Sequence, residues 1–106
     1  MGKEPLGRRH RRLNRKLDEL LKSPRANMKE IELYHNKIAG IEDIMVNRNL
    51  KGIELEKKAN IEDAVRLYEQ NVADEFDGTH PYNRLAIIYR KKRQFDGEIR
   101  VLKKAI

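Results

Sequence analysis

The chain matches itself when it is shifted by 34 residues without a gap, so that residues 45–72 align with residues 79–106. Five aligned pairs are identical, and the apolar positions coincide, as Val65 does with Ile99. Self-similarity at a fixed period of this size is typical of stacked helical repeats, in which each unit is one supersecondary element. The period therefore predicts two copies of one helical unit.

Each unit is predicted to contain two helices. Helices are expected over about 45–58 and 61–74, since Asn60 is a favourable N-cap, and Asp77-Gly78 is a turn signal between the units. Pro81 and Gln94 then open a third and a fourth helix. The positions predicted to face inward share a helical spacing: Ile61, Ala64, Val65, Tyr68, Val72, Tyr82, Leu85, Ala86, Tyr89, Phe95, Ile99, Leu102, Ala105 and Ile106.

The second unit reads Tyr82-x2-Leu85-Ala86-x2-Tyr89 and continues to Phe95. This spacing resembles the tetratricopeptide repeat (TPR) family, whose units are 34 residues long. The first unit is similar to the same pattern at three positions, Gly52, Ala64 and Tyr68. The resemblance implies an all-α fold, an α-α superhelix of TPR-like helix-turn-helix hairpins. The alternative is a generic helical bundle in which the spacing is coincidental.

Four positions depart from the family pattern, which has large apolar or small residues there: Arg48, Lys51, Asn71 and Glu98. Phe76 also occupies the place where the family usually has proline. These departures leave the detailed helix contacts of the resemblance open.

The rest of the chain divides at a change in composition. Residues 1–12 contain Gly, Pro and a basic cluster and are predicted to be a flexible arm, and residues 13–44 to be helical. Stacked hairpins need neighbours to cover their apolar faces. Residues 13–44 are therefore expected to pack as an N-terminal cap on repeats 45–78 and 79–106. The apolar stripe at the end of the last helix predicts either self-association or a longer natural chain.

One helical face of each unit remains outside the predicted core, and the resemblance places it in the concave groove of a TPR array. Asn and Ile recur on this face at the same positions of both units, with basic residues beside them. Such a surface fits an extended or helical protein segment that carries acidic residues. The alternative is a face that is merely solvated or covered by the N-terminal helices. The predicted groove residues are Asn49, Ile53, Lys57, Asn83, Arg84, Ile87, Arg90 and Lys91.

A second hypothesis is nucleic-acid binding through the N-terminal region. Residues 1–25 hold nine Lys and Arg against three Asp and Glu, whereas residues 26–106 hold fifteen against fourteen. Basic clusters neutralise phosphates, but no aromatic residue interleaves with this one for base stacking. A solubilising tail or a patch for an acidic protein is the alternative. The candidate contacts are Arg8, Arg9, Arg11, Arg12, Arg15 and Lys16.

Catalysis, metal binding and cofactor binding are not predicted. The chain has no Cys, its three His are scattered, and it has no Gly-rich phosphate loop or nucleophile motif. Its apolar runs are far shorter than the roughly 20 residues that cross a bilayer. We therefore expect a cytoplasmic protein-interaction or oligomerisation module that is not an enzyme, with a protein, a peptide or a second copy as its partner.

Overall fold

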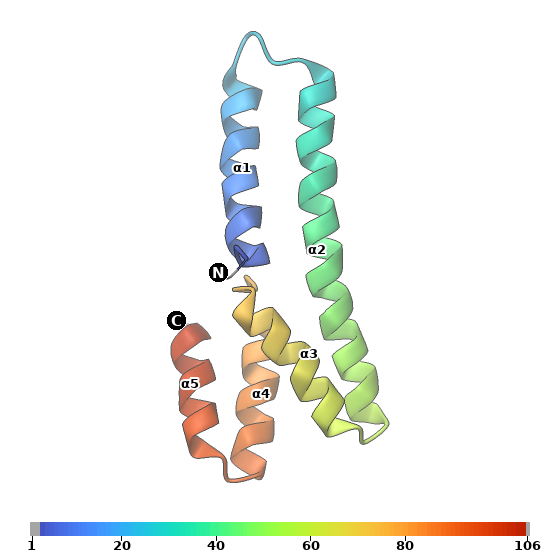
Figure 1. Cartoon of the computed structure of the whole chain (residues 1–106), viewed down its shortest axis with the longest axis vertical. Coiled ribbons are helices and arrows are strands. Elements are labelled where there is room, and N and C mark those ends of the chain that lie inside the picture. Colours follow the sequence, from blue (N-terminus) through green and yellow to red (C-terminus); the bar gives the residue numbers. More distant parts are fainter. Residues whose placement is uncertain (1–2, 106) are drawn as a thin grey trace.

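The computed structural model describes residues 3–105, and all regular structure in that range is helical (Figure 1). In chain order the helices are α1 (Leu6–Lys22), α2 (Met28–Lys57), α3 (Ile61–Ala73), α4 (His80–Lys91) and α5 (Phe95–Ala105). The prediction of an all-α fold is confirmed. The molecule is elongated, with extents of 56 × 27 × 26 Å.

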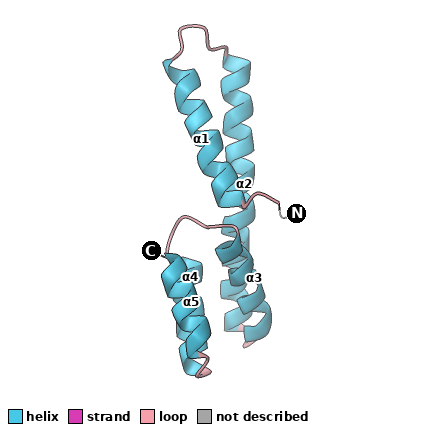
Figure 2. Cartoon of the chain, turned by 60° about the vertical axis from the view of Figure 1, so that its left-hand side comes forward, coloured by secondary structure: helices cyan, strands magenta, loops and turns pink. Residues whose placement is uncertain are grey.

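Helix α2 is the spine of the molecule. It spans 30 residues, or about 45 Å at 1.5 Å per residue, and the side chain of Asn27 caps its start by accepting from the amide of Glu30. Helices α1 and α3 lie end to end along it, with α1 beside its first part and α3 beside its second (Figures 1 and 2). The prediction that a helix begins at about residue 45 is wrong, because α2 runs through that position. The apolar stripe of α2 continues from Ile38 through Met45 to Gly52.

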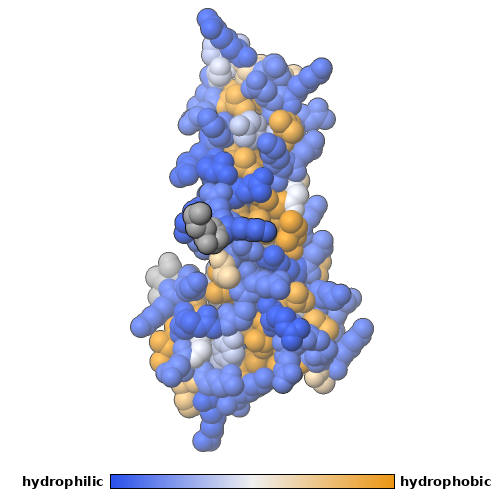
Figure 3. All heavy atoms as spheres, in the orientation of Figure 1, coloured by the Kyte–Doolittle hydropathy of each residue, from blue (hydrophilic) through white to orange (hydrophobic). Residues whose placement is uncertain are grey.

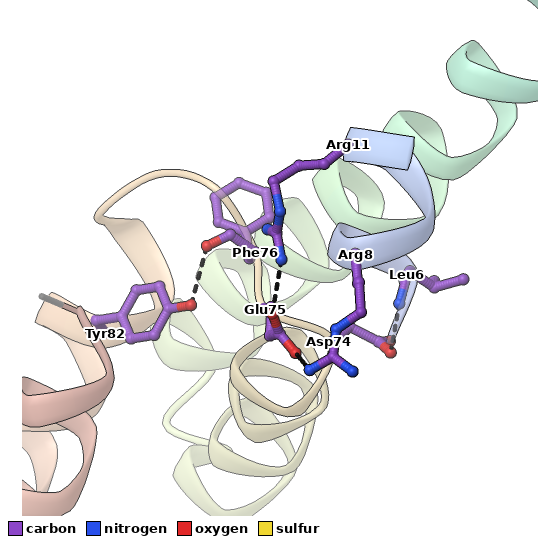
Figure 4. A network of polar contacts seen from close by, with 7 residues as sticks. All are labelled: Leu6, Arg8, Arg11, Asp74, Glu75, Phe76 and Tyr82. Atoms are coloured by element: carbon purple, nitrogen blue, oxygen red, sulfur yellow. Dashed lines mark hydrogen bonds and ion pairs between the residues drawn. The ribbon is translucent and has the colours of Figure 1, made fainter. Parts of the chain in front are cut away.

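The prediction of a flexible arm over residues 1–12 is also wrong from Leu6 onward, because α1 begins there. The start of α1 meets the end of α3. The Leu6 amide donates to Asp74 Oδ1 (3.0 Å) and the Gly7 amide donates to the Asp74 carbonyl (2.6 Å). Arg8 and Arg11 extend from α1 toward the residue that follows Asp74 (Figure 4). We call this contact the α3–α1 junction; residues 1–2 of the predicted arm lie outside the described residues.

Glycine is required at position 7 because the two helix ends approach so closely. A Cβ atom at Gly7 would lie 2.2 Å from the Glu75 carbonyl oxygen and 2.5 Å from that of Asp74. Both atoms belong to the backbone, so no side-chain movement can relieve the clash. The glycine that suggested disorder in the sequence is therefore part of a tight helix-to-helix contact.

The two predicted hairpin turns have the same backbone geometry, 34 residues apart. Ala59 and Arg93 have φ angles of 60° and 58°. The amide of Asn60 donates to the Leu55 carbonyl at 2.8 Å, and the amide of Gln94 donates to the Tyr89 carbonyl at 2.8 Å. A residue in the left-handed region followed by this long-reaching hydrogen bond is a common way to end a helix. At these two turns, the 34-residue period of the sequence is thus matched by the same backbone conformation and hydrogen bond.

The apolar core forms two clusters. One lies between α1 and α2 around Leu13, Leu17 and Met45, and apolar side chains reach the surface along this seam in Figure 3. The other lies among α3, α4 and α5 and consists of Ala64, Tyr68, Val72, Tyr82, Leu85, Ala86, Ile88 and Val101. Phe76, in the loop between α3 and α4, packs against both clusters. The loop therefore connects the two halves of the molecule.

All the predicted inward positions of α3 and α4 are buried or half-buried, but those described in α5 are exposed. Phe95, Ile99, Leu102 and Ala105 are exposed, which contradicts the prediction, and α5 buries Glu98 and Val101 instead. The reason is that α5 packs on α4 with one side, and no described helix covers the apolar stripe on its other side. Ile106 lies outside the described residues.

His80, the first residue of α4, lies against this second cluster. Its ring is edge-on to Tyr68 with centroids 5.4 Å apart, and its buried Nε2 has no hydrogen-bond partner among residues 3–105. Burial, aided by the nearby Arg84 charge and opposed by Glu56, holds the pKa of His80 below its usual value of 6.5. Folding therefore favours the neutral ring.

The junction predicts opposite effects for two Gly→Ala substitutions. We expect Gly7→Ala to lower the free energy of unfolding by about 2 kcal/mol, since the backbones must separate. Gly40→Ala should raise it by about 0.5–1 kcal/mol, because Gly40 is within α2 and a Cβ atom there meets nothing within 4 Å. Urea denaturation of both variants measures the difference. Equal stability of Gly7→Ala and the wild type would contradict the described junction.

His80 predicts a specific loss of stability at mildly acidic pH. Because its folded pKa lies below its unfolded pKa, the unfolded state binds the proton first, and stability falls as pH drops below about 6.5. The carboxylates with lowered pKa values, such as Glu56 and Glu69, add their losses only below about 4.5. The loss between about pH 7 and pH 5 should be smaller in His80→Phe than in wild type. Substitution of the exposed His35 by Phe is the matched control, because it makes the same change of residue type outside the second core cluster.

Candidate partner-binding surface

Helices α2 and α4 are joined by a half-buried ion pair, Arg84 with Glu56. The Arg84 Nη2 and Nε atoms donate to the two oxygens of Glu56 at 2.5 and 3.1 Å. Tyr68 of α3 donates its hydroxyl to the same carboxylate at 2.6 Å. One acidic side chain of α2 thus receives a donor from α3 and two from α4, which fixes the positions of the three helices.

The charge of Glu56 is stabilised by these donors. Burial alone would raise its pKa, but the hydrogen bonds from Arg84 and Tyr68 outweigh burial and hold the pKa below the usual 4.5. The pKa of Tyr68 is raised, first by burial and then by this hydrogen bond. The two sides of the pair therefore keep their charges at neutral pH, and bidentate geometry adds directional strength.

Apolar side chains flank the Arg84–Glu56 pair on both helices. Val46, Leu50 and Ile53 follow i, i+4, i+7 spacing on α2, and Ile53 lies one turn before Glu56. Ile87 lies one turn after Arg84 on α4. The exposed fractions of Val46, Leu50 and Ile87 are 46, 56 and 42 %, whereas Ile53 is half-buried. We call this set the α2–α4 surface.

A cavity opens at the Val46 end of the α2–α4 surface. Its volume is about 320 Å³, and Met45 and Val46 of α2, Gly7 of α1 and Phe76 of the α3–α4 loop are among its lining residues. His10 and Glu42 stand at the same cavity and contact each other at 2.8 Å. Val46 thus connects the apolar row of α2 to a hollow large enough for one apolar side chain.

The prediction that Asn49 is one of the eight groove residues is wrong. Asn49 is buried, and its Oδ1 accepts from the side chain of Asn71 at 2.9 Å. Arg84 is occupied by Glu56, and the Arg90 guanidinium contacts the buried Glu98 at 2.7 Å although most of Arg90 is exposed. Ile53 is half-buried on α2 and Ile87 is exposed on α4, and the Arg84–Glu56 pair links these two helices. The remaining three residues are exposed along the same helices: Lys57, Asn83 and Lys91.

A buried polar network between α2 and α3 was not predicted from the sequence. Asn71 is fully buried and donates to the Met45 carbonyl and to Asn49, while its own oxygen accepts from Arg48. Arg48 also contacts Asp74 Oδ2 at 2.6 Å. Arg48 and Asn71 are two of the departures from the TPR pattern, and here each is the partner of the other. The sequence did contain a signal for this network, because Arg48 and Asn71 are both polar at positions where the TPR pattern has apolar or small residues.

Three of the six candidate basic residues of α1 are in ion pairs within the molecule. Arg8 and Arg11 contact the two oxygens of Glu75 at 2.8 and 2.7 Å (Figure 4), and Arg12 contacts Glu4 at 2.9 Å. The hydrogen bond from Arg11, followed by the contribution of Arg8, holds the pKa of Glu75 below its usual range. The other three candidate contacts are exposed on α1: Arg9, Arg15 and Lys16.

A second cavity, of about 550 Å³, lies between α1 and the end of α5. Arg8, Arg11 and Lys104 line it together with Glu75 and Asp77, and Tyr82 donates its hydroxyl to the Phe76 carbonyl at its wall. Both acids and bases line this cavity, and the two arginines are already bound to Glu75. Its chemistry favours no particular charged ligand.

Two general properties hold for residues 3–105. None of their helices combines the length and the apolar character that crossing a membrane requires. Within the same range, no three His, Cys, Asp or Glu side chains gather closely enough to hold a metal ion.

Comparisons with known proteins found no relative of this chain. No family model, no curated protein and no solved structure matches the chain. The function is therefore argued from the geometry of the described residues.

Proposed function

We propose that the chain is a protein-interaction module that binds an amphipathic segment of a partner protein across the α2–α4 surface. The observation that carries this proposal is that α2 has an exposed apolar row and α4 has the exposed Ile87, while the half-buried Arg84–Glu56 pair joins the two helices. Apolar side chains held by rigid helices are the usual anchors for a bound segment. Because the ion pair already fixes the two helices, the partner would meet a preformed surface.

We also propose that the two hairpins stack in the manner of TPR units. The matched turns at Ala59 and Arg93 support this arrangement, as does the contact of Tyr68 with Gly52, where a Cβ atom would lie 2.4 Å from the Tyr68 ring. A small residue at this place lets neighbouring helices approach, which the family resemblance implies for Gly52. In such a stack, α2 and α4 contribute the equivalent faces of two successive units.

The partner segment should carry apolar residues at helical spacing and acidic residues near one end. Leu50, Ile53 and Lys57 of α2 are equivalent by the 34-residue shift to Arg84, Ile87 and Lys91 of α4. Both series therefore end in an exposed lysine, where an acidic side chain of the partner gains a favourable contact. The cavity beside Val46 would take a larger apolar side chain from the opposite end of the segment.

Nucleic-acid binding through α1 is the weaker alternative. Arg8, Arg11 and Arg12 are in ion pairs with carboxylates, and a phosphate would have to displace those partners. Exposed Arg9, Arg15 and Lys16 retain the charge that a phosphate backbone requires. A cytoplasmic location and the lack of catalysis remain predictions from the sequence.

A selection of binding peptides tests the proposed function directly. We would select binders from a library of displayed helical peptides on the immobilised protein and measure their affinities by fluorescence anisotropy. The selected peptides should share apolar residues at i, i+4, i+7 spacing and acidic residues near one end. The substitutions Leu50→Asp and Ile87→Asp should each weaken binding about tenfold or more, because they place a charge in the contact.

Ile44→Asp is the matched control for these variants. Ile44 lies on α2 with an exposed fraction of 47 %, close to that of Val46, but off the line formed by Leu50 and Ile53. Its substitution should leave affinity unchanged. If the selected peptides bound Ile87→Asp and Leu50→Asp as tightly as wild type, the α2–α4 surface would not be the binding site.

A further inference from the structure

Helix α5 carries an uncovered apolar stripe on the side that faces away from the molecule. Phe95, Ile99 and Leu102 follow i, i+4, i+7 spacing, and their exposed fractions are 54, 51 and 40 %. In Figure 1, α5 stands at the outer edge of the lower half with α4 beside it, and apolar surface is visible at the lower left edge of Figure 3. The face is a surface distinct from the α2–α4 surface.

The internal repeat indicates what kind of element this stripe is built to contact. By the 34-residue shift, Phe95, Ile99 and Leu102 are equivalent to Ile61, Val65 and Tyr68 of α3. Those α3 residues belong to or pack against the core cluster that contains four residues of α4. Where α3 has the following hairpin beside this stripe, α5 has no described helix on the stripe side, although α4 packs on its other side. The contact that α5 lacks is therefore with another helix.

Charges beside the stripe determine which helix fits best. Asp96 precedes Ile99 and Lys103 follows Leu102, and the two lie seven residues apart on the same flank of α5. Neither is in an ion pair within residues 3–105. Two other charges of α5 are already paired, because Glu98 contacts Arg90 and Arg100 contacts Glu69. An available acid and an available base are thus at opposite ends of one apolar stripe.

We propose that the α5 stripe is the contact surface for a second copy of this chain, with two α5 helices antiparallel about a two-fold axis at Ile99. In that arrangement Ile99 meets Ile99 of the second copy, and Phe95 lies opposite Leu102. Equivalent flanks of antiparallel helices face each other, so Asp96 of each copy lies opposite Lys103 of the other. A two-fold interface must be self-complementary, and this stripe with its two charges satisfies that condition.

The area of this contact sets its strength. Two helices of 11 residues bury less surface than a standard protein interface, so the dimer should be weak and concentration-dependent. Antiparallel packing also aligns the two helix dipoles favourably, since the first turn of each helix lies beside the last turn of the other. Association of this kind leaves the α2–α4 surface free for a different partner.

Sedimentation equilibrium of the intact chain, from low micromolar to millimolar concentration, tests the proposal. Wild type should shift reversibly from monomer to dimer. Ile99→Asp should raise the dissociation constant about tenfold or more, because it places two like charges at the axis. Leu33→Asp is the control, since Leu33 on α2 has the same exposed fraction of 51 % and should leave dimerisation unchanged.

A charge exchange tests the antiparallel register itself. Asp96→Lys and Lys103→Asp should each weaken the dimer about threefold to tenfold at low salt, whereas the double variant should return to within about threefold of wild type. Circular dichroism checks that every variant keeps its helix content. A monomer at all concentrations would overturn the proposal and leave the stripe to a helix of another protein. A dimer unaffected by Ile99→Asp, or one that the double variant fails to restore, would also overturn it.

Discussion

The structure depends on the contact between the end of α3 and the start of α1. The last turn of a helix leaves carbonyl groups without partners, and the first turn leaves amides without partners. At the α3–α1 junction these groups meet, because the Asp74 carbonyl and carboxylate accept from the amides of Gly7 and Leu6. Asp74 also contacts Arg48 of α2. One residue thereby holds three helices at one place.

This junction explains why a 30-residue helix can serve as the spine of so small a chain. Neither α1 nor α3 is long enough to cover α2, but placed end to end they cover its apolar stripe from Ile38 to Gly52. Two arginines of α1 then act as structural residues, since Arg8 and Arg11 bind Glu75 beside the junction. Two helical faces remain for partners: the α2–α4 surface and the stripe of α5.

The sequence predicted features that depend on local signals. The turns before Asn60 and Gln94 follow from the 34-residue period, and both are present, although the Asn60 side chain donates to Asp63 and makes no cap hydrogen bond. Features set by distant partners were not predictable in this way. Asn49 is buried because it accepts a hydrogen bond from Asn71 on the facing helix. The first turn of α1 is ordered because its Leu6 amide donates to Asp74.

The same limit applies to the candidate surfaces. A helical apolar stripe looks identical in the sequence whether a neighbour covers it, as in α3, or leaves it exposed, as at Ile99 of α5. The repeat alone predicts that Ile53, Arg84 and Ile87 share one surface. The role of Glu56 as the carboxylate between them required the structure, because its donors come from two other helices.

Native-state hydrogen exchange of the backbone amides tests the central claim, that α1 is locked to α3 from its first turn. The account predicts that the Leu6 and Gly7 amides exchange as slowly as the amides of the α3 core, including that of Tyr68. Exchange of residues 6–12 at the rate of an unstructured chain would contradict it. The basic residues of α1 would then belong to a free arm, as the composition alone suggests.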